Sequence, residues 1–157
     1  MKTLEERFWE KVNRTGECWL WTGAKNDRGY GYFKAAGRNA KAHRVSYQIS
    51  KGAIPDGINI DHICHNTSCV RPDHLRLATQ KQNLENLTGA HSTNVTSGVR
   101  GVYRSREGRW QARVTHNRTI HTAGTHATIQ QAEAAVIALR NQLFTHNDAD
   151  RQQQRAS

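Results

Sequence analysis

The segment from residue 60 to residue 75 constrains this chain more than any other, because it gathers cysteine and histidine at short spacings. Cys64 and Cys69 are separated by four residues, and His74 follows Cys69 after four more. Thiolates and imidazoles are preferred zinc ligands, and such spacings let one loop wrap a tetrahedral ion. The mean hydropathy is −0.83, so the core must be small, and small domains often recruit a metal. The segment therefore predicts a structural zinc site.

A closed structural zinc site needs four protein ligands, so this segment must find one more elsewhere. Cys18 is the only other cysteine of the chain, and we predict that it is the fourth ligand. His65 and His43 are the competing candidates. Three cysteines are an odd number, which argues against a disulfide framework and fits a reducing cytosol if all three bind zinc.

A second group of polar residues surrounds the cysteines. Asp61 and His62 stand just before Cys64, and Asn83 lies nine residues beyond His74. A neutral imidazole suits general-base catalysis, whereas Asp and Asn oxygens suit a hard ion such as Mg²⁺. The segment therefore predicts two metals with different roles.

Residues 60–83 resemble the HNH nucleases of the ββα-metal (His-Me finger) superfamily. The Cys-x4-Cys-x4-His run resembles their zinc-containing branch, the His-Cys box homing endonucleases and related phage HNH proteins. The resemblance implies that His62 is the general base and that Asn83 is the helix-borne ligand of the catalytic ion, Mg²⁺ or another divalent ion. His74 stands where many HNH proteins have an Asn that orients the base. In the zinc-containing branch that position is a zinc ligand, so we assign His74 to zinc.

Three further residues are candidates for the same site. Asp61 is either a second ligand of the catalytic ion or a source of hydrogen bonds around it. His43 and Arg44 are candidates for contact with the scissile phosphate, because they add local positive charge. The resemblance implies hydrolysis of a phosphodiester bond to a 5′-phosphate and a 3′-hydroxyl.

The charge of the chain favours nucleic acid as its partner. Its 157 residues carry a formal net charge of +10, with an isoelectric point near 10.1. Residues 97–144 contain seven basic residues, all Arg, against two acidic ones. Arg makes bidentate contacts with phosphate and guanine. No apolar run reaches transmembrane length and no signal peptide is evident, so we expect a cytoplasmic protein, in the host cytoplasm if phage-encoded, without a membrane partner.

Local patterns predict an α+β chain. In the first part we expect a capped helix over 4–13, a hairpin of strands at 18–21 and 30–33, a helix over 42–49, a strand that leads into Asp61, and a helix over 79–87 that turns Asn83 toward His62. In the second part we expect a linker over 88–97, strands at 99–103, 109–115 and 119–123, a helix that starts at Thr128, and a disordered tail over 145–157.

The segments Ser97–Tyr103, Gly108–Ala112 and Gly124–Thr125 resemble an AP2-type DNA-binding domain, which also occurs appended to phage and homing HNH nucleases. The resemblance implies that arginines and aromatics of a three-stranded sheet enter the major groove. The predicted DNA-contacting residues are Arg100, Arg104, Arg109, Trp110 and Arg113. Glu107 stands where plant members carry an aromatic and Arg113 where they carry an acid, so base preference does not transfer.

The sequence thus predicts a zinc-stabilised HNH endonuclease domain over 1–87 and an AP2-like DNA-binding domain over 98–144. We expect a metal-dependent endonuclease of phage or homing type that acts on double-stranded DNA as a monomer or homodimer. The alternative is a non-catalytic, zinc-containing DNA-binding regulator, and an RNA-directed nuclease is a third reading. A pure binder has no need of Asp61, His62 and Asn83 together, which favours the nuclease.

Overall fold

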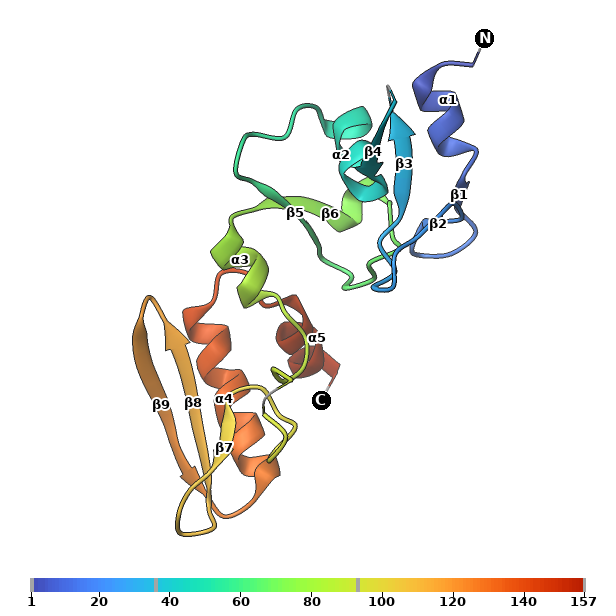
Figure 1. The fold of residues 1–157 in the computed structure, drawn as a ribbon. Coiled ribbons are helices and arrows are strands. Elements are labelled where there is room, and N and C mark those ends of the chain that lie inside the picture. Colours follow the sequence, from blue (N-terminus) through green and yellow to red (C-terminus); the bar gives the residue numbers. More distant parts are fainter. Residues whose placement is uncertain (1, 36, 93, 157) are drawn as a thin grey trace. The chain divides into compact units, whose positions relative to one another are not determined.

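The computed structural model describes residues 2–35, 37–92 and 94–156, and the chain divides into two compact units, Met1–Asn83 and Leu84–Ser157 (Figure 1). The division falls inside a helix rather than after residue 87. The predicted linker over 88–97 lies within the second unit, and its Thr93 is outside the described residues.

The first unit begins with a helix that is shorter than expected. Helix α1 spans Leu4–Trp9, and the predicted capping box between Thr3 and Glu6 is confirmed. The expectation of a helix to residue 13 is wrong, because β1 (Val12–Asn13) pairs with β2 (Leu20–Trp21). The backbone N–H of Thr22 also donates to the Lys11 carbonyl at 2.9 Å. Sheet pairing therefore ends the helix early.

The predicted hairpin between residues 18–21 and 30–33 is also wrong. Strand β3 (Tyr32–Ala35) pairs instead with β4 (Arg38–Lys41), in the register Phe33↔Ala40. Gly37 has a φ of 78°, a left-handed conformation that glycine adopts without steric cost, and this permits a tight turn between the two strands. A local hairpin therefore replaces the longer-range pairing.

Helix α2 (Ala42–Lys51) joins two small cores of this unit. Its Val45 belongs to an aromatic cluster in which the Phe8 and Trp21 rings stack at 5.1 Å. Its Tyr47 packs in a second cluster with Ile60 and Leu75. The predicted helix over 42–49 is confirmed, and it fixes the strand that carries the candidate base.

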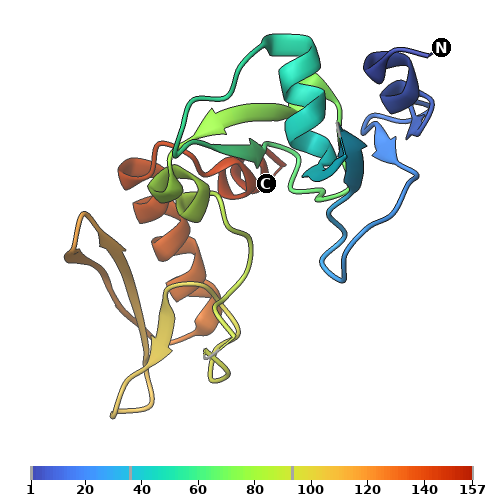
Figure 2. The same ribbon diagram turned by 45° about the horizontal axis from the view of Figure 1, so that its top comes forward.

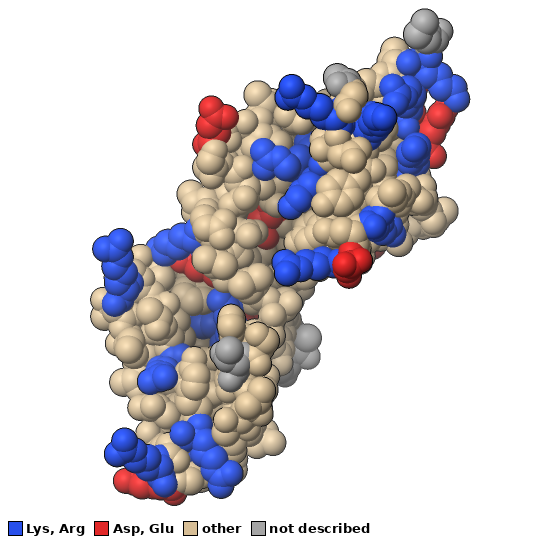
Figure 3. Space-filling model, viewed as in Figure 1, with Lys and Arg blue, Asp and Glu red and all other residues tan. Residues whose placement is uncertain are grey.

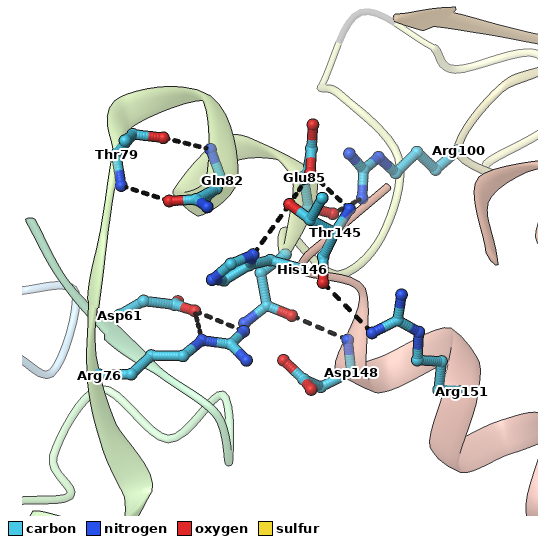
Figure 4. Close-up of polar contacts among 11 residues, drawn as sticks. Asp61, Arg76, Thr79, Gln82, Glu85, Arg100, Thr145, His146, Asp148 and Arg151 are labelled. Atoms are coloured by element: carbon cyan, nitrogen blue, oxygen red, sulfur yellow. Dashed lines mark hydrogen bonds and ion pairs between the residues drawn. The ribbon is translucent and has the colours of Figure 1, made fainter. Parts of the chain in front are cut away.

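The predicted strand into Asp61 and the predicted helix that carries Asn83 are present, and a second strand lies between them. Strand β5 (Asn59–His62) pairs antiparallel with β6 (Leu75–Ala78), and the short 3₁₀ helix η1 (Pro72–His74) precedes β6. Helix α3 follows at Gln80–Glu85 (Figure 1). Thr79 and Gln82 cap its start reciprocally: the Gln82 N–H donates to Thr79 Oγ1 at 3.2 Å, and the Thr79 N–H donates to Gln82 Oε1 at 2.8 Å (Figure 4).

The second unit is a three-stranded antiparallel sheet with a helix across one face (Figures 1 and 2). Its elements are β7 (Val102–Arg104), β8 (Trp110–His116), β9 (Thr119–His126), α4 (Ile129–Leu143) and α5 (Asp148–Ala156). The core between sheet and α4 consists of Val102, Ala112, Val114, Ala132, Val136 and Phe144. Thr128 caps α4 as predicted, since its side chain accepts from the Gln131 N–H.

The end of the chain differs from the expectation of a disordered tail, because α5 forms there. Asp150 accepts two hydrogen bonds from Arg140, from Nε at 2.6 Å and from Nη2 at 2.9 Å. Asn147 is only 2% exposed, and its amide donates to Asn141. Polar side-chain pairing rather than an apolar stripe thus holds this segment, which hydrophobic periodicity does not reveal.

Candidate active site and metal centre

Four side chains of the first unit converge as a candidate zinc centre: Cys18, Cys64, Cys69 and His74, whose ligand atoms all lie within 4.8 Å of one another. Nδ1 of His74 is 3.6 Å from Sγ of both Cys18 and Cys69. Ordinary Zn–S and Zn–N bond lengths at a tetrahedral angle place a sulfur and a nitrogen about 3.6 Å apart. The cluster can therefore hold a zinc ion, and its fourth member is Cys18 rather than His65 or His43.

Backbone pairing brings Cys18 to the loop that carries the other two cysteines. The Trp21 N–H donates to the Ser68 carbonyl at 2.9 Å, and the Val70 N–H donates to the Trp19 carbonyl at 2.8 Å. Leu20 and Cys69 form an isolated antiparallel bridge between these segments. These backbone contacts thus bring Cys18 close to Cys64 and Cys69, although it lies far from them in the sequence.

The loop itself is tightly turned. His65 has a φ of 56°, a left-handed conformation that is uncommon for a residue with a Cβ. The Asn66 side chain accepts from the Ser68 N–H at 3.0 Å, and the Asn66 carbonyl accepts from the Cys69 N–H at 3.0 Å. These bonds direct Cys64 and Cys69 toward one point.

The thiols of the cluster differ in acidity because they hydrogen-bond to one another. A hydrogen bond from Cys69 lowers the pKa of Cys64 to about 4, and the same contact raises the pKa of Cys69. Burial raises the pKa of Cys18. Zinc binds thiolates, so metal uptake here releases protons.

His62 is the last residue of β5 and is buried, with 7% of its surface exposed. Its Nε2 lies 3.0 Å from the Cys69 carbonyl oxygen. A carbonyl can only accept, so Nε2 carries the proton and the neutral ring has its lone pair on Nδ1. Burial lowers the pKa of His62, which keeps the ring neutral. The Cys69 carbonyl thus fixes the tautomer of His62, the candidate base.

Two further rings pack around His62. The His43 ring on α2 lies 4.8 Å from the His62 ring, and the Tyr30 ring lies 5.5 Å from His43 and 6.1 Å from His62. His43 is 4% exposed, and its Nδ1 has no hydrogen-bond partner among the described residues. Burial, followed by the charges of His62, Lys41 and Arg44, lowers the pKa of His43 to about 3. Both imidazoles are therefore neutral at pH 7.

The positive charge nearest these rings comes from Lys41 and Arg44. Nζ of Lys41 lies 5.1 Å from the centre of the Tyr30 ring. The Arg44 guanidinium donates to the Ile58 carbonyl at 3.1 Å, so it helps to hold the segment that leads into β5.

Asp61 is buried beside His62 in sequence but is engaged with Arg76. Nε and Nη2 of Arg76 both donate to Asp61 Oδ2, at 3.0 and 2.8 Å (Figure 4). The two residues are direct cross-strand partners of β5 and β6. The guanidinium therefore holds the carboxylate in place.

Asn83 lies on α3 and is half-buried. Its backbone N–H donates to the Thr79 carbonyl at 2.9 Å, so it is part of the capped first turn. Its amide oxygen is a suitable ligand for a hard divalent ion.

The arginines that the sequence predicts as DNA contacts fall into different environments. Trp110 packs against the core beneath α4, and the Arg104 guanidinium lies 5.6 Å from its ring. Strand alternation places Arg113 on the opposite, open face, where its guanidinium lies 4.2 Å from the Tyr103 ring. Arg109 is exposed in the β7–β8 turn region. Arg100 binds backbone carbonyls of the chain.

Basic side chains are distributed over both units on the face drawn in Figure 3, with few acidic ones among them.

Three site residues escape inspection of the sequence: Tyr30, Arg76 and Tyr103. Only Arg76 carries a usable signal, because a ββ pairing between 59–62 and 75–78 would place it opposite Asp61. No helix in the described part of the chain is long and apolar enough to cross a membrane.

Comparison with known proteins links this geometry to a family. Residues 40–85 match the family model for HNH endonuclease. The chain is 39% identical to Protein 7.7 of Escherichia phage T7 over 71 residues, 45% of this chain and 55% of that protein. It is 35% identical to Protein 2.8 of the same phage over 83 residues, 51% of this chain and 56% of that protein.

The chain is also similar to an uncharacterized HNH endonuclease of Acanthamoeba polyphaga mimivirus, at 33% identity over 103 residues, 65% of this chain and 52% of that protein. It spans about half the length of these curated relatives. No solved structure matches it significantly.

Proposed function

We propose that this chain, whose residues 40–85 form an HNH endonuclease domain, is a metal-dependent endonuclease that hydrolyses DNA with His62 as general base. The observation that carries the proposal is the orientation of His62, which lies inside the matched segment. Its Nε2–H is held by the Cys69 carbonyl, so the basic Nδ1 has a fixed direction. A buried histidine with a fixed neutral tautomer is suited to accept a proton from water.

The chemistry requires three things: a nucleophilic water, charge neutralisation at phosphorus, and stabilisation of the leaving 3′ oxygen. Nδ1 of His62 takes the proton of the water. Asn83 is the ligand that we assign to the divalent ion, with Asp61 as the second ligand or as a neighbour that orients it. When bound, such an ion stabilises the negative charge on the phosphate and the leaving oxygen.

Asp61 requires an exchange of partners to serve as a ligand through Oδ2, because Arg76 donates to that oxygen twice. The alternative role leaves the Asp61–Arg76 pair intact as a brace across β5 and β6. Arg44 remains a candidate for phosphate contact through its charge, whereas His43 remains one only as a neutral hydrogen-bond donor, because its pKa of about 3 removes the positive charge. The ring of His43 adjoins His62, whereas Arg44 is bonded to the Ile58 carbonyl.

Zinc has a different role in this proposal. Three thiols and one imidazole would occupy all four coordination positions of a tetrahedral zinc ion and leave none open for substrate. The ion therefore holds the loop between β5 and η1, and through the Cys69 carbonyl it also holds the ring of His62. Zinc thus supports the base without taking part in the reaction.

The second unit supplies affinity for DNA. Its three-stranded sheet with one helix has the elements of the AP2-like domain that we infer for residues 98–144. The open face of the sheet offers Arg113 against Tyr103, and Arg109 adds charge at its edge. We propose that this face binds double-stranded DNA, in a nuclease of phage or homing type, acting as a monomer or homodimer.

The decisive experiment is cleavage of supercoiled plasmid with Mg²⁺, with and without EDTA, by wild type and by His62→Ala. We expect His62→Ala to lower the cleavage rate by about 10²–10⁴-fold, the usual contribution of a general base. The matched control is His65→Asn, in the same loop, because Asn tolerates the positive φ of this position. This variant should cleave at nearly the wild-type rate.

Zinc content and DNA affinity should be the same in all three proteins. DNA ligase alone should seal the nicks, because the products carry a 5′-phosphate and a 3′-hydroxyl. Binding of DNA without cleavage by the wild type would favour the non-catalytic regulator, and equal cleavage by His62→Ala would reject His62 as the base.

A further inference from the structure

Three backbone carbonyls at and after the end of α3 are bound by one side chain, that of Arg100. Its Nη1 donates to the carbonyl of Glu85 at 3.1 Å (Figure 4) and to that of Leu87 at 2.5 Å, and its Nη2 donates to that of Leu84 at 2.9 Å. The last carbonyls of a helix have no partner within the helix. Arg100 therefore acts as a charged C-terminal cap.

The residues just after Asn83 are also held through their side chains. The Glu85 carboxylate is 5% exposed and accepts from the N–H and the Oγ1 of Thr145, at 3.0 and 3.1 Å. The ring of His116 lies 3.4 Å from the same carboxylate. The Asn86 side chain accepts from the Asp148 N–H at 3.0 Å. The end of α3 is thus anchored to the core of the second unit.

Arg100 is itself fixed by its neighbours. Its guanidinium lies 5.4 Å from the Phe144 ring, and its own carbonyl accepts from Arg140 Nη1 at 2.5 Å. Arg140 is in turn paired with Asp150. Burial, followed by the charge of Arg140, lowers the pKa of Arg100. The half-buried guanidinium of Arg100 is thus already bonded to groups of the protein.

We propose that Arg100 is a positioning residue for Asn83: by capping the last turn of α3 it holds the ligand of the catalytic ion in place. The inference rests on the proposed function, in which Asn83 binds that ion. Helix α3 has only six residues, and a helix of that length is not stable by itself. Thr79 and Gln82 cap its start, and Arg100 completes its other end.

This inference assigns Arg100 a role other than the DNA contact that the sequence suggests. A DNA-contacting Arg determines affinity and its salt dependence, whereas a positioning residue determines how well the site binds its metal. Residues that orient a metal ligand typically change metal affinity by about 10–100-fold when they are replaced. Replacing Arg100 should therefore change DNA affinity if it contacts DNA, and metal affinity if it positions Asn83.

The experiment compares Arg100→Ala and Arg100→Lys with Arg113→Ala, which removes the same charge from strand β8. For each full-length variant we would measure the Mg²⁺ concentration for half-maximal cleavage and the DNA affinity at several salt concentrations. Amide hydrogen exchange of residues 83–87 gives a readout that does not depend on cleavage. Circular dichroism and zinc content establish that each variant is folded.

We expect Arg100→Ala to raise the Mg²⁺ requirement by about 10-fold or more and to speed exchange over 83–87, with DNA affinity near wild type. Arg100→Lys should be intermediate, because one ammonium cannot span three carbonyls. Arg113→Ala should weaken DNA binding and reduce the salt slope by about one, with an unchanged Mg²⁺ requirement.

Wild-type exchange and Mg²⁺ dependence in both Arg100 variants would overturn the inference, as would a loss of DNA affinity equal to that of Arg113→Ala. An inactive wild type would instead reject the proposed function. The exchange measurement would still report whether Arg100 holds the end of α3.

Discussion

His43 should make the first unit sensitive to acid, and His43→Gln should remove that sensitivity. The ring is 4% exposed and its Nδ1 has no hydrogen-bond partner among the described residues. It packs against the rings of His62 and Tyr30, and the charges of Lys41 and Arg44 oppose its protonation. Glutamine places its amide near the position of Nε2 and cannot be protonated, so it keeps the shape without the titration.

The magnitude follows from the pKa of His43, which is about 3 in the folded protein against 6.5 for an unperturbed histidine. Between these values the unfolded chain binds a proton that the folded protein does not, so the free energy of unfolding falls as the pH falls. Each pH unit is worth about 1.4 kcal/mol. His43 should therefore contribute a loss of about 2 kcal/mol between pH 7 and pH 5, and no change above pH 7.

Urea denaturation at pH 7, 6 and 5, followed by tryptophan fluorescence, measures this effect. Other groups titrate in the same range, including the zinc ligands, but their contributions are common to both proteins and cancel in the difference. The difference between wild type and His43→Gln should shift by about 2 kcal/mol in favour of the variant from pH 7 to pH 5. A constant difference across this range would show that His43 is protonated in the folded state and that the reasoning is wrong.

Three further substitutions test the metal sites. Cys69→Ser should abolish stoichiometric zinc binding and unfold the first unit, because a structural zinc ion contributes about 10–16 kcal/mol to the folding of small zinc domains. Atomic absorption measures the zinc content, and circular dichroism measures the folding. A metal-free variant as stable as wild type would contradict this prediction. Asp61→Asn and Arg76→Ala separate the two roles of Asp61 in Mg²⁺ titrations of cleavage. A direct ligand predicts that only Asp61→Asn raises the Mg²⁺ requirement, whereas a brace across the strands predicts a rise in both variants.

The candidate zinc ligands can be predicted because the chain has few cysteines to choose from. The spacing of Cys64, Cys69 and His74 is local, and only one cysteine remained for the fourth position. Which backbone path delivers Cys18 was not predictable. It depends on the pairing of residues 19–21 with residues 68–70, and no local pattern specifies a contact between segments so far apart.

The positions of strands and helices along the chain are predicted better than the pairing of the strands. Helix α2 and strand β5 lie where their patterns place them, since α2 buries Val45 and Tyr47 and β5 buries Ile60. The pairing of β1 with β2, and of β3 with β4, was missed because several short strands of similar composition compete for partners. Helix α5 was missed because an Arg140–Asp150 ion pair holds it.

The arginines of the second unit show why net charge alone does not measure a DNA-binding surface. Residues 97–144 carry seven arginines, and the sequence gives no reason to separate them. In the fold, Arg140 is paired with Asp150 and Arg100 is bound to three carbonyls, so neither guanidinium is available to neutralise a phosphate. The salt dependence of DNA binding counts neutralised phosphates, so it should follow the exposed arginines and Arg113 rather than the total. Both side chains are instead engaged within the protein, because Arg100 caps the end of α3 and Arg140 donates to the Arg100 carbonyl.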